Sequence, residues 1–214
     1  MSNPAWQADE LFVGLPLSSF RIAGSSNPKS KRTVGVSLKL YFSLTQTKTY
    51  IQSCLPLSTH ALSQPLPVDL FIIPDLLSLP SAQSLLSNTP IALGAPDCFW
   101  EDEGAFTGAV SPRNLKELGV SIVELGHAER RRLFHETDET VALKAKAVVR
   151  NDMTPLVCIG EKHRGSVEEA IAEVKPQVES ILAVVGDSEV IFAYEPVWAI
   201  GQPEPADSGY VVGV

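Results

Sequence analysis

The chain has 214 residues, of which 44% are hydrophobic and 20% charged, and this composition excludes a disordered chain and suits one packed domain. The net charge of −8 disfavours general binding to nucleic acid, because an acidic surface repels phosphate backbones. Three widely spaced cysteines fit a cytoplasmic protein, and no apolar run reaches the roughly 18 residues of a membrane span.

Residues 1–33 precede the first regular pattern, and we expect them to form a disordered N-terminal extension. Their Ser, Lys and Arg residues are typical of organelle transit peptides, but Asp9 and Glu10 argue against that role. We therefore place the folded domain at residues 34–214.

From Val34 onward, short apolar runs alternate with longer amphipathic segments, which is the pattern of repeated βα units around a parallel sheet. The expected strands are Val34–Leu38, Val68–Ile73, Ile91–Leu93, Ser121–Leu125, Met153–Ile159 and Val190–Tyr194. The expected helices are Leu44–Leu55, Ser78–Leu86, Arg113–Leu118, Asp138–Val149, Val167–Val184 and one that begins near Ala206. Asp138 is the expected N-cap of its helix, Pro176 should kink or split the long helix, and Gly186 should end it.

The strands recur about every 30 residues, which is the size of one unit in a (β/α)8 barrel of roughly 250 residues. A doubly wound sheet would give a similar pattern, but no Gly-rich phosphate loop follows the first strand. The fold class is therefore α/β, an incomplete (β/α)8 barrel with about six βα units. We expect the seventh and eighth units to be missing, which would leave the sheet with two open edges.

Polar residues at the carboxyl ends of these strands are the candidates for chemistry, because loops gather there over a common face. Lys39 follows the first strand, His127 the fourth and Glu195 the sixth. A carboxylate that removes a carbon-bound proton, an electrophile that polarises a carbonyl and a cation that holds an anion together suit proton abstraction beside a carbonyl.

Each candidate also has a purely structural interpretation. A histidine after a strand often caps a backbone group, and a lone lysine is usually a surface residue. Glu195 lies among apolar and aromatic residues, which should desolvate it and raise its pKa, although a buried glutamate paired with arginine is an alternative. We expect ion pairs that support the site among Glu129, Arg130, Arg131 and Glu136.

The segment Pro196-Val197-Trp198-Ala199-Ile200-Gly201 is a candidate lid. A rigid start leads to Gly201, whose backbone N–H can approach a ligand closely. The alternative is an apolar loop packed on the barrel rim.

Two long motifs resemble the triosephosphate isomerase family. They are Glu124-Leu125-Gly126-His127-Ala128-Glu129-Arg130-Arg131 and Ala193-Tyr194-Glu195-Pro196-Val197-Trp198-Ala199-Ile200-Gly201. Shorter matches are Gly104-Ala105-Phe106-Thr107-Gly108, which resembles the dimer-forming third loop, and Cys158-Ile159-Gly160-Glu161 after the fifth strand. The resemblance covers residues 34–214.

This resemblance implies a partial TIM barrel that interconverts dihydroxyacetone phosphate and glyceraldehyde 3-phosphate through an enediolate, as an aldose-ketose isomerase of cytoplasmic glycolysis and gluconeogenesis. Glu195 would be the base and His127 the neutral electrophile, the pairing known for triosephosphate isomerase itself. Lys39 would bind substrate and stabilise the enediolate, Ser37 and Gly201 would also bind substrate, and Glu129, Arg130 and Cys158 would support the site. The resemblance implies no metal and no cofactor, a homodimer, and no nucleic-acid or membrane partner.

Three departures from the family pattern favour other outcomes. Ser37 stands where the family has Asn, Ala128 where it has Ser, and Gln202-Pro203-Glu204-Pro205 where it has Thr-Gly-Lys-Thr. One alternative is therefore an isomerase of tetrose (erythrulose) phosphate. Because the loops of the missing seventh and eighth units carry most of the phosphate site in such barrels, the other is an inactive truncated product that lacks this site. An aldolase-like barrel with Lys39 as the Schiff-base residue would leave His127 and Glu195 unexplained.

Overall fold

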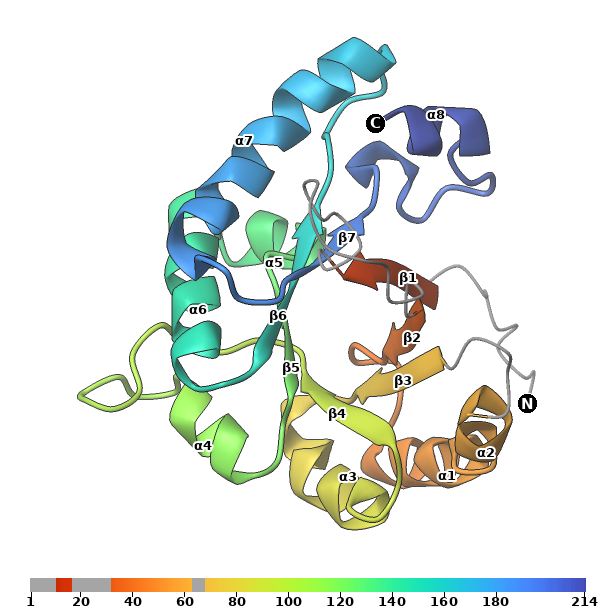
Figure 1. Cartoon of the computed structure of the whole chain (residues 1–214), viewed down its shortest axis with the longest axis vertical. Coiled ribbons are helices and arrows are strands. Elements are labelled where there is room, and N and C mark those ends of the chain that lie inside the picture. Colours follow the sequence, from red (N-terminus) through yellow and green to blue (C-terminus); the bar gives the residue numbers. More distant parts are fainter. Residues whose placement is uncertain (1–10, 17–31, 63–67) are drawn as a thin grey trace.

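The structure, a computed structural model, describes residues 11–16, 32–62 and 68–214 and shows an α/β barrel (Figure 1). Its strands are β1 (Leu11–Pro16), β2 (Arg32–Ser37), β3 (Val68–Ile73), β4 (Ile91–Ala95), β5 (Ile122–Leu125), β6 (Thr154–Ile159) and β7 (Ile191–Tyr194). The strands β2 to β7 are parallel, and each pairs with its sequence neighbour, as in part of a TIM barrel. The predicted fold class, with about six βα units, is confirmed.

The predicted open edges are wrong within the described residues, because β1 closes the barrel. This strand runs antiparallel to both β2 and β7, with Leu11 opposite Val36 and Leu15 opposite Phe192. Backbone groups that two open edges would leave unpaired therefore have partners. The strand lies inside the segment 1–33 that we expected to be disordered, of which residues 1–10 and 17–31 lie outside the described residues.

Helices cover the outside of the barrel (Figure 1). They are α1 (Leu44–Cys54), α2 (Leu57–Leu62), α3 (Leu79–Leu86), α4 (Pro112–Glu117), α5 (Ala128–Leu133), α6 (Asp138–Arg150), α7 (Val167–Val185) and α8 (Ser208–Gly213), with 3-10 turns η2 (Leu76–Ser78) and η3 (Val197–Ala199). The sequence pattern missed α2 and α5. Both are six residues long, and α5 buries none of its residues, so no apolar face marks it in the sequence.

Successive side chains of a strand point to opposite faces of the sheet, so the apolar residues form one layer inside the barrel and one outside it. Phe71 and Ile73 of β3 and Ile122 of β5 belong to a small cluster formed by strand residues alone. Ile72 and Val123, one position along, belong to a larger cluster that also contains helix residues. The smaller cluster therefore fills the barrel interior, and the larger one lies between the sheet and the helices.

Of the three predicted helix signals, the N-cap is wrong and the effect of Pro176 is wrong in part. Thr137, not Asp138, is the N-cap of α6, because its side chain accepts from the Thr140 N–H in a capping box. Pro176 lies inside the continuous helix α7 and does not split it. It faces solvent, where water can satisfy the carbonyl that loses its partner. Gly186 ends α7 with φ +59°, as predicted.

The described helices include none with the length and apolar character that crossing a bilayer requires.

Candidate active site

The carboxyl ends of the parallel strands bring the predicted residues to one end of the barrel. Lys39 follows β2, His127 follows β5 and Glu195 follows β7. Ser37 and Cys158 lie within the last two residues of β2 and β6. Residues separated by more than 150 positions in sequence thus lie at the same end of the barrel, because parallel strands run in the same direction.

His127 is held as a neutral hydrogen-bond donor. It is the N-cap of α5, and its Nδ1 accepts from the Glu129 backbone N–H at 3.2 Å. The proton of the neutral ring therefore lies on Nε2. Burial, followed by the charge of Lys39, lowers the pKa of His127 to about 4, so the imidazole is uncharged near pH 7.

The Nε2 atom of His127 points toward the proposed base. It lies 3.7 Å from Oε2 of Glu195, and it is buried without a hydrogen-bond partner among the described residues. A buried N–H without a partner is costly in a folded protein. A substrate oxygen placed between β5 and β7 would satisfy it.

Lys39 supplies a positive charge beside these two groups. Its Nζ lies 3.2 Å from Oε1 of Glu129, and its side chain is 12% exposed. The backbone of Lys39 has φ +46°, a left-handed conformation that costs a non-glycine residue on the order of 1–2 kcal/mol. Such strain at a lysine directly after a strand is typical of a residue held in place for a function.

Glu124 is a buried carboxyl that the sequence analysis did not select as a site residue. It lies on β5 facing the barrel interior, accepts from the Ser37 hydroxyl at 2.6 Å, and lies 3.8 Å from the Cys158 thiol. Burial raises the pKa of Glu124 to about 7 despite the opposing effects of Ser37 and Lys39. Its place within an apolar strand was the available signal, since such strands rarely carry a charge.

We predict that Glu124→Gln removes part of the pH dependence of stability. A carboxyl whose pKa rises from 4.5 in the unfolded chain to about 7 in the fold contributes stability below pH 4.5 and loses it as the pH rises through 7. From pH 4.5 to 8 the wild type should lose stability relative to the variant, by on the order of 3 kcal/mol. Chemical denaturation at both pH values measures this, with exposed Glu179→Gln as the control. A constant difference between wild type and Glu124→Gln would contradict the raised pKa.

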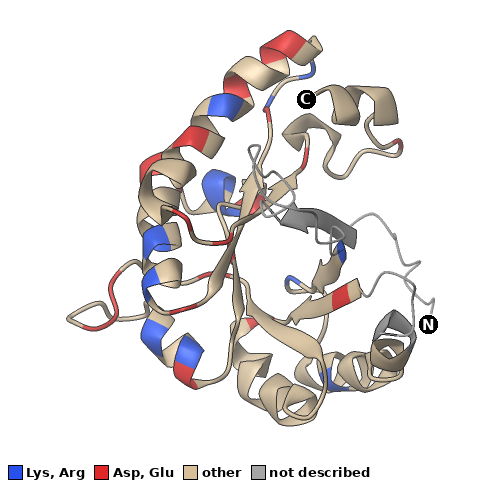
Figure 2. Cartoon of the chain, viewed as in Figure 1, with Lys and Arg blue, Asp and Glu red and all other residues tan. Residues whose placement is uncertain are grey.

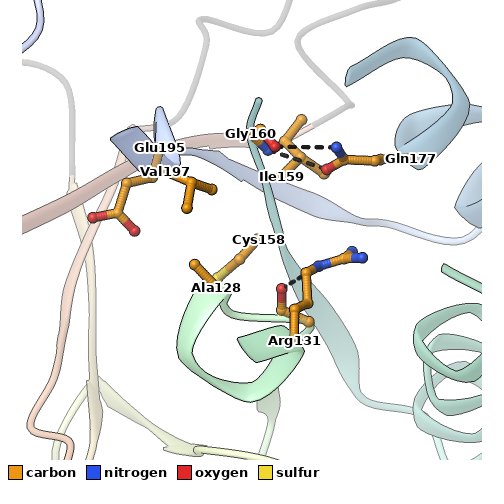
Figure 3. A pocket seen from close by; sticks show the side chains of 9 residues that line it. Ala128, Arg131, Cys158, Ile159, Gly160, Gln177, Glu195 and Val197 are labelled. Atoms are coloured by element: carbon orange, nitrogen blue, oxygen red, sulfur yellow. Dashed lines mark hydrogen bonds between the residues drawn. The ribbon is translucent and has the colours of Figure 1, made fainter. Parts of the chain in front are cut away.

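The backbone of Glu195 rests against a tightly packed turn after β6 (Figure 3). A Cβ on Gly160 would lie 1.9 Å from the Glu195 carbonyl oxygen, so only glycine fits there. The buried Gln177 of α7 holds the same turn with two hydrogen bonds of 3.1 Å, one to the N–H and one to the carbonyl of Gly160. Figure 3 shows Gln177 and Glu195 on opposite sides of Gly160. Gln177 was also missed, because nothing in its helical pattern distinguishes it from a surface residue.

A cavity of about 20 Å³ lies beside the Glu195 side chain. Its lining includes Ala128 and Cys158, and it has room for one water molecule. Ala128, which stands where the family pattern has Ser, thus adjoins a small space next to the proposed base.

We predict that Gly160→Ala lowers any turnover that depends on Glu195 by on the order of 10²-fold. The added methyl group must displace the Glu195 carbonyl, and a misplacement of about 1 Å at a reacting group has that effect. Initial rates at saturating substrate measure this. Gly186→Ala is the control, because it introduces strain at φ +59° where a Cβ would contact nothing within 4 Å. Equal losses in both variants would assign the effect to general destabilisation.

Charged residues around α5 form ion pairs behind the site, and Figure 2 shows the arginines of this helix. Arg130 contacts Glu136 at 2.6 Å and Asp97 at 2.7 Å. Lys144, only 6% exposed at its side chain, contacts the same two carboxylates. Arg131 contacts Asp138 at 2.6 Å and also donates to the Gly126 carbonyl. These contacts hold the start of α5, and with it His127.

Gly201 lies apart from this cluster. It is exposed with φ +71° and does not line the cavity beside Glu195. In the described part of the chain, no group of three or more His, Cys, Asp or Glu residues is placed to hold a metal ion.

Comparison with known proteins finds one family. The model of the triosephosphate isomerase family matches residues 32–213. The L-erythrulose-1-phosphate isomerase of Pectobacterium atrosepticum is 42% identical over 186 residues, which cover 85% of this chain and 72% of that protein. The protein of the same name from Rhizobium etli is 40% identical, covering 78% of this chain and 64% of that protein. The triosephosphate isomerase of Dictyoglomus turgidum is 37% identical, covering 80% and 69%.

Proposed function

Because the chain belongs to the triosephosphate isomerase family, a family of sugar-phosphate isomerases, we propose that it isomerises a small ketose phosphate, with L-erythrulose 1-phosphate as the favoured substrate. The observation that carries the chemistry is the neutral His127, whose Nε2 lies 3.7 Å from the Glu195 carboxylate. Relatives named for erythrulose phosphate support the choice of substrate.

The reaction begins with proton abstraction by Glu195. Its carboxylate takes a proton from the carbon next to the carbonyl, and the electrons of that C–H bond form a carbon–carbon double bond. The carbonyl electrons move to oxygen, where the Nε2–H of His127 stabilises the developing charge. The proton of the neighbouring hydroxyl then moves, through His127, to the former carbonyl oxygen, which becomes a hydroxyl while the neighbouring oxygen becomes the new carbonyl. Glu195 returns its proton to the former carbonyl carbon.

Electrostatics favour this sequence of steps. A neutral imidazole donates to an enediolate without starting as a charged acid, which matches the low pKa of His127. The ammonium of Lys39 attracts the anionic substrate and the enediolate. The N–H of Gly201 would bind the phosphate when the lid closes.

With erythrulose 1-phosphate, the same chemistry links two ketoses. The carbon on the side of the carbonyl away from the phosphate carries a secondary hydroxyl, so proton transfer moves the ketone one position along the chain. The product is erythrulose 4-phosphate. The reaction is therefore an isomerisation in which no aldose forms.

Ser37 supports a substrate larger than a triose. Its side chain is shorter than that of the Asn in the family pattern, and its hydroxyl proton is already donated to Glu124. The hydroxyl can therefore only accept from a substrate, and the four-carbon ketose has one more carbon with its own hydroxyl. Triose phosphate is the second candidate, supported by the relative from Dictyoglomus turgidum.

We also propose that the chain forms homodimers through the loop 104–108. The loop resembles the dimer-forming third loop of the family, and its Phe106 presents an apolar side chain that is 44% exposed. Sedimentation velocity tests this, and a purely monomeric species would contradict it.

Proton exchange decides among the candidate activities. The purified chain is incubated in D₂O with L-erythrulose 1-phosphate or with dihydroxyacetone phosphate, and deuterium incorporation and product are followed by NMR. We expect incorporation with both and faster turnover of erythrulose phosphate. Faster turnover of the triose would favour the second candidate. No incorporation with either would identify the chain as an inactive product.

A further inference from the structure

Glu161 is a buried carboxylate after β6 that lies outside the proposed chemistry. It is 1% exposed, and within the described part of the chain it forms no ion pair with Lys or Arg. Three neutral donors from different elements surround it instead. They are the hydroxyl of Tyr194 at 3.0 Å, the indole N–H of Trp198 at 2.6 Å and the hydroxyl of Tyr210 at 2.8 Å.

These donors bracket the lid segment. Tyr194 ends β7 immediately before Glu195, Trp198 lies in η3 at the start of the lid, and Tyr210 lies in α8 beyond its end. Trp198 and Tyr210 donate to the same oxygen, Oε1, and their rings meet edge to face with centroids 5.7 Å apart. Both ends of the segment therefore converge on one carboxylate.

The position of Tyr210 is itself well determined. Oδ1 of Asp207 accepts from the N–H groups of Gly209 and Tyr210, which fixes the first turn of α8. At the other end, Gly213 packs closely on Val167 at the start of α7. A Cβ added to this glycine would lie only 3.2 Å from the Val167 side chain. Figure 1 shows α8 near the carboxyl end of β7. The hydroxyl of Tyr210 thus reaches Glu161 from a helix held at both ends.

The exposed residues between the two donors have few other restraints. Residues 201–205 are exposed, and the N–H groups of Ile200 and Gln202 bond only to carbonyls within the turn, those of Val197 and Ala199. Backbone with few buried contacts opens at low free-energy cost. At its start the segment is also held by the Val197 N–H, which donates to the Glu161 carbonyl at 2.9 Å, and by Arg164, which lies over the Trp198 ring. Beyond its end, the contact of Tyr210 with Glu161 is the attachment that bears on its position.

We propose that Tyr210 is a positioning residue that ties the C-terminal end of the lid to Glu161 and thereby controls how the segment after Glu195 opens and closes. For its catalytic consequence this inference depends on the proposed isomerase function. The restraint of the lid by the Tyr210–Glu161 hydrogen bond can be tested without any activity.

The test replaces tyrosine by phenylalanine at two positions that donate to the same carboxylate. Tyr210→Phe removes the tie to α8, whereas Tyr194→Phe removes an equivalent hydrogen bond that comes from the strand. Hydrogen exchange by NMR at the Ile200 and Gln202 amides is the main measurement. We expect about tenfold faster exchange in Tyr210→Phe, the effect of losing one hydrogen bond to a charged group, and no change in Tyr194→Phe.

Two outcomes would overturn the proposal. Unchanged exchange at both amides in Tyr210→Phe would show that α8 does not restrain the lid. Equal acceleration in the two variants would assign the effect to general loosening around Glu161. Thermal unfolding of each variant establishes that the fold is retained before exchange is compared.

Kinetics give a second, separable measurement. With the substrate that the wild type turns over, Tyr210→Phe should raise KM about fivefold and change kcat less than twofold, because the lid would contribute mainly to phosphate binding. A fall in kcat at unchanged KM would contradict a role in positioning the lid. Absence of turnover in the wild type would refute the proposed function and leave the exchange result as the test of the tie.

Discussion

Replacing Glu195 by Gln is expected to lower kcat by on the order of 10³-fold, because the amide cannot accept the carbon-bound proton. The side chain keeps its size and its place beside His127, so the fold should be retained. Glu195→Asp keeps the carboxylate but retracts it by about 1 Å, and a loss on the order of 10²-fold is expected. Initial rates and deuterium incorporation from D₂O measure both variants.

The matched control is Glu179→Gln on the outer face of α7, where the side chain is 62% exposed. It makes the same chemical change far from the barrel mouth and should leave the rate unchanged. Normal turnover of Glu195→Gln would remove this residue from the role of base. In that case the buried Glu124 would become the carboxyl to test.

Replacing His127 by Ala is expected to lower kcat by on the order of 10²–10³-fold, since one preorganised donor to the developing oxyanion is lost. The ring is also the N-cap of α5, so some stability should be lost as well. His163→Ala, at an exposed position after β6, is the control for general effects. Turnover with the purified variants measures the difference.

The low pKa of His127 predicts a distinct pH dependence. The unfolded chain binds a proton at this residue near pH 6.5, whereas the folded chain binds it only near pH 4. The wild type should therefore lose stability relative to His127→Ala as the pH falls from 6.5 to 4. The ¹⁵N chemical shifts of the His127 ring report its protonation directly. A ring that titrates near pH 6.5 in the folded protein would contradict the neutral electrophile.

Much of the barrel could be predicted from local pattern. The strand β3 was predicted with its observed ends, and the helix α7 within one residue of its end, because apolar runs and helical periods extend over enough residues to be distinct. The helix α5 was missed because it buries none of its residues, which leaves no apolar face in the pattern. The strand β1 was missed because its pairing with β2 and β7 depends on contacts distant in sequence.

Some residues of the candidate site could be selected from the sequence, and others only from the structure. Lys39, His127 and Glu195 could be selected because chemistry-bearing side chains after apolar strands are conspicuous. Gln177 could not, because its importance lies in a partner from another element. Glu161 also follows an apolar strand, in the motif Cys158-Ile159-Gly160-Glu161, but its partners become visible only in the fold. From sequence alone, a polar residue in a helix or turn is expected to be exposed to solvent, and only the fold shows that it is buried.

The sequence by itself determined the α/β class, the repeat of about 30 residues and the residue types available at the strand ends, because these follow from local periodicity and composition. Only the tertiary structure decided that β1 closes the barrel, that His127 is neutral with Nε2 toward Glu195, and that one buried carboxylate joins both ends of the lid. Burial and distance set pKa values and hydrogen-bond partners, and both are properties of the assembled fold.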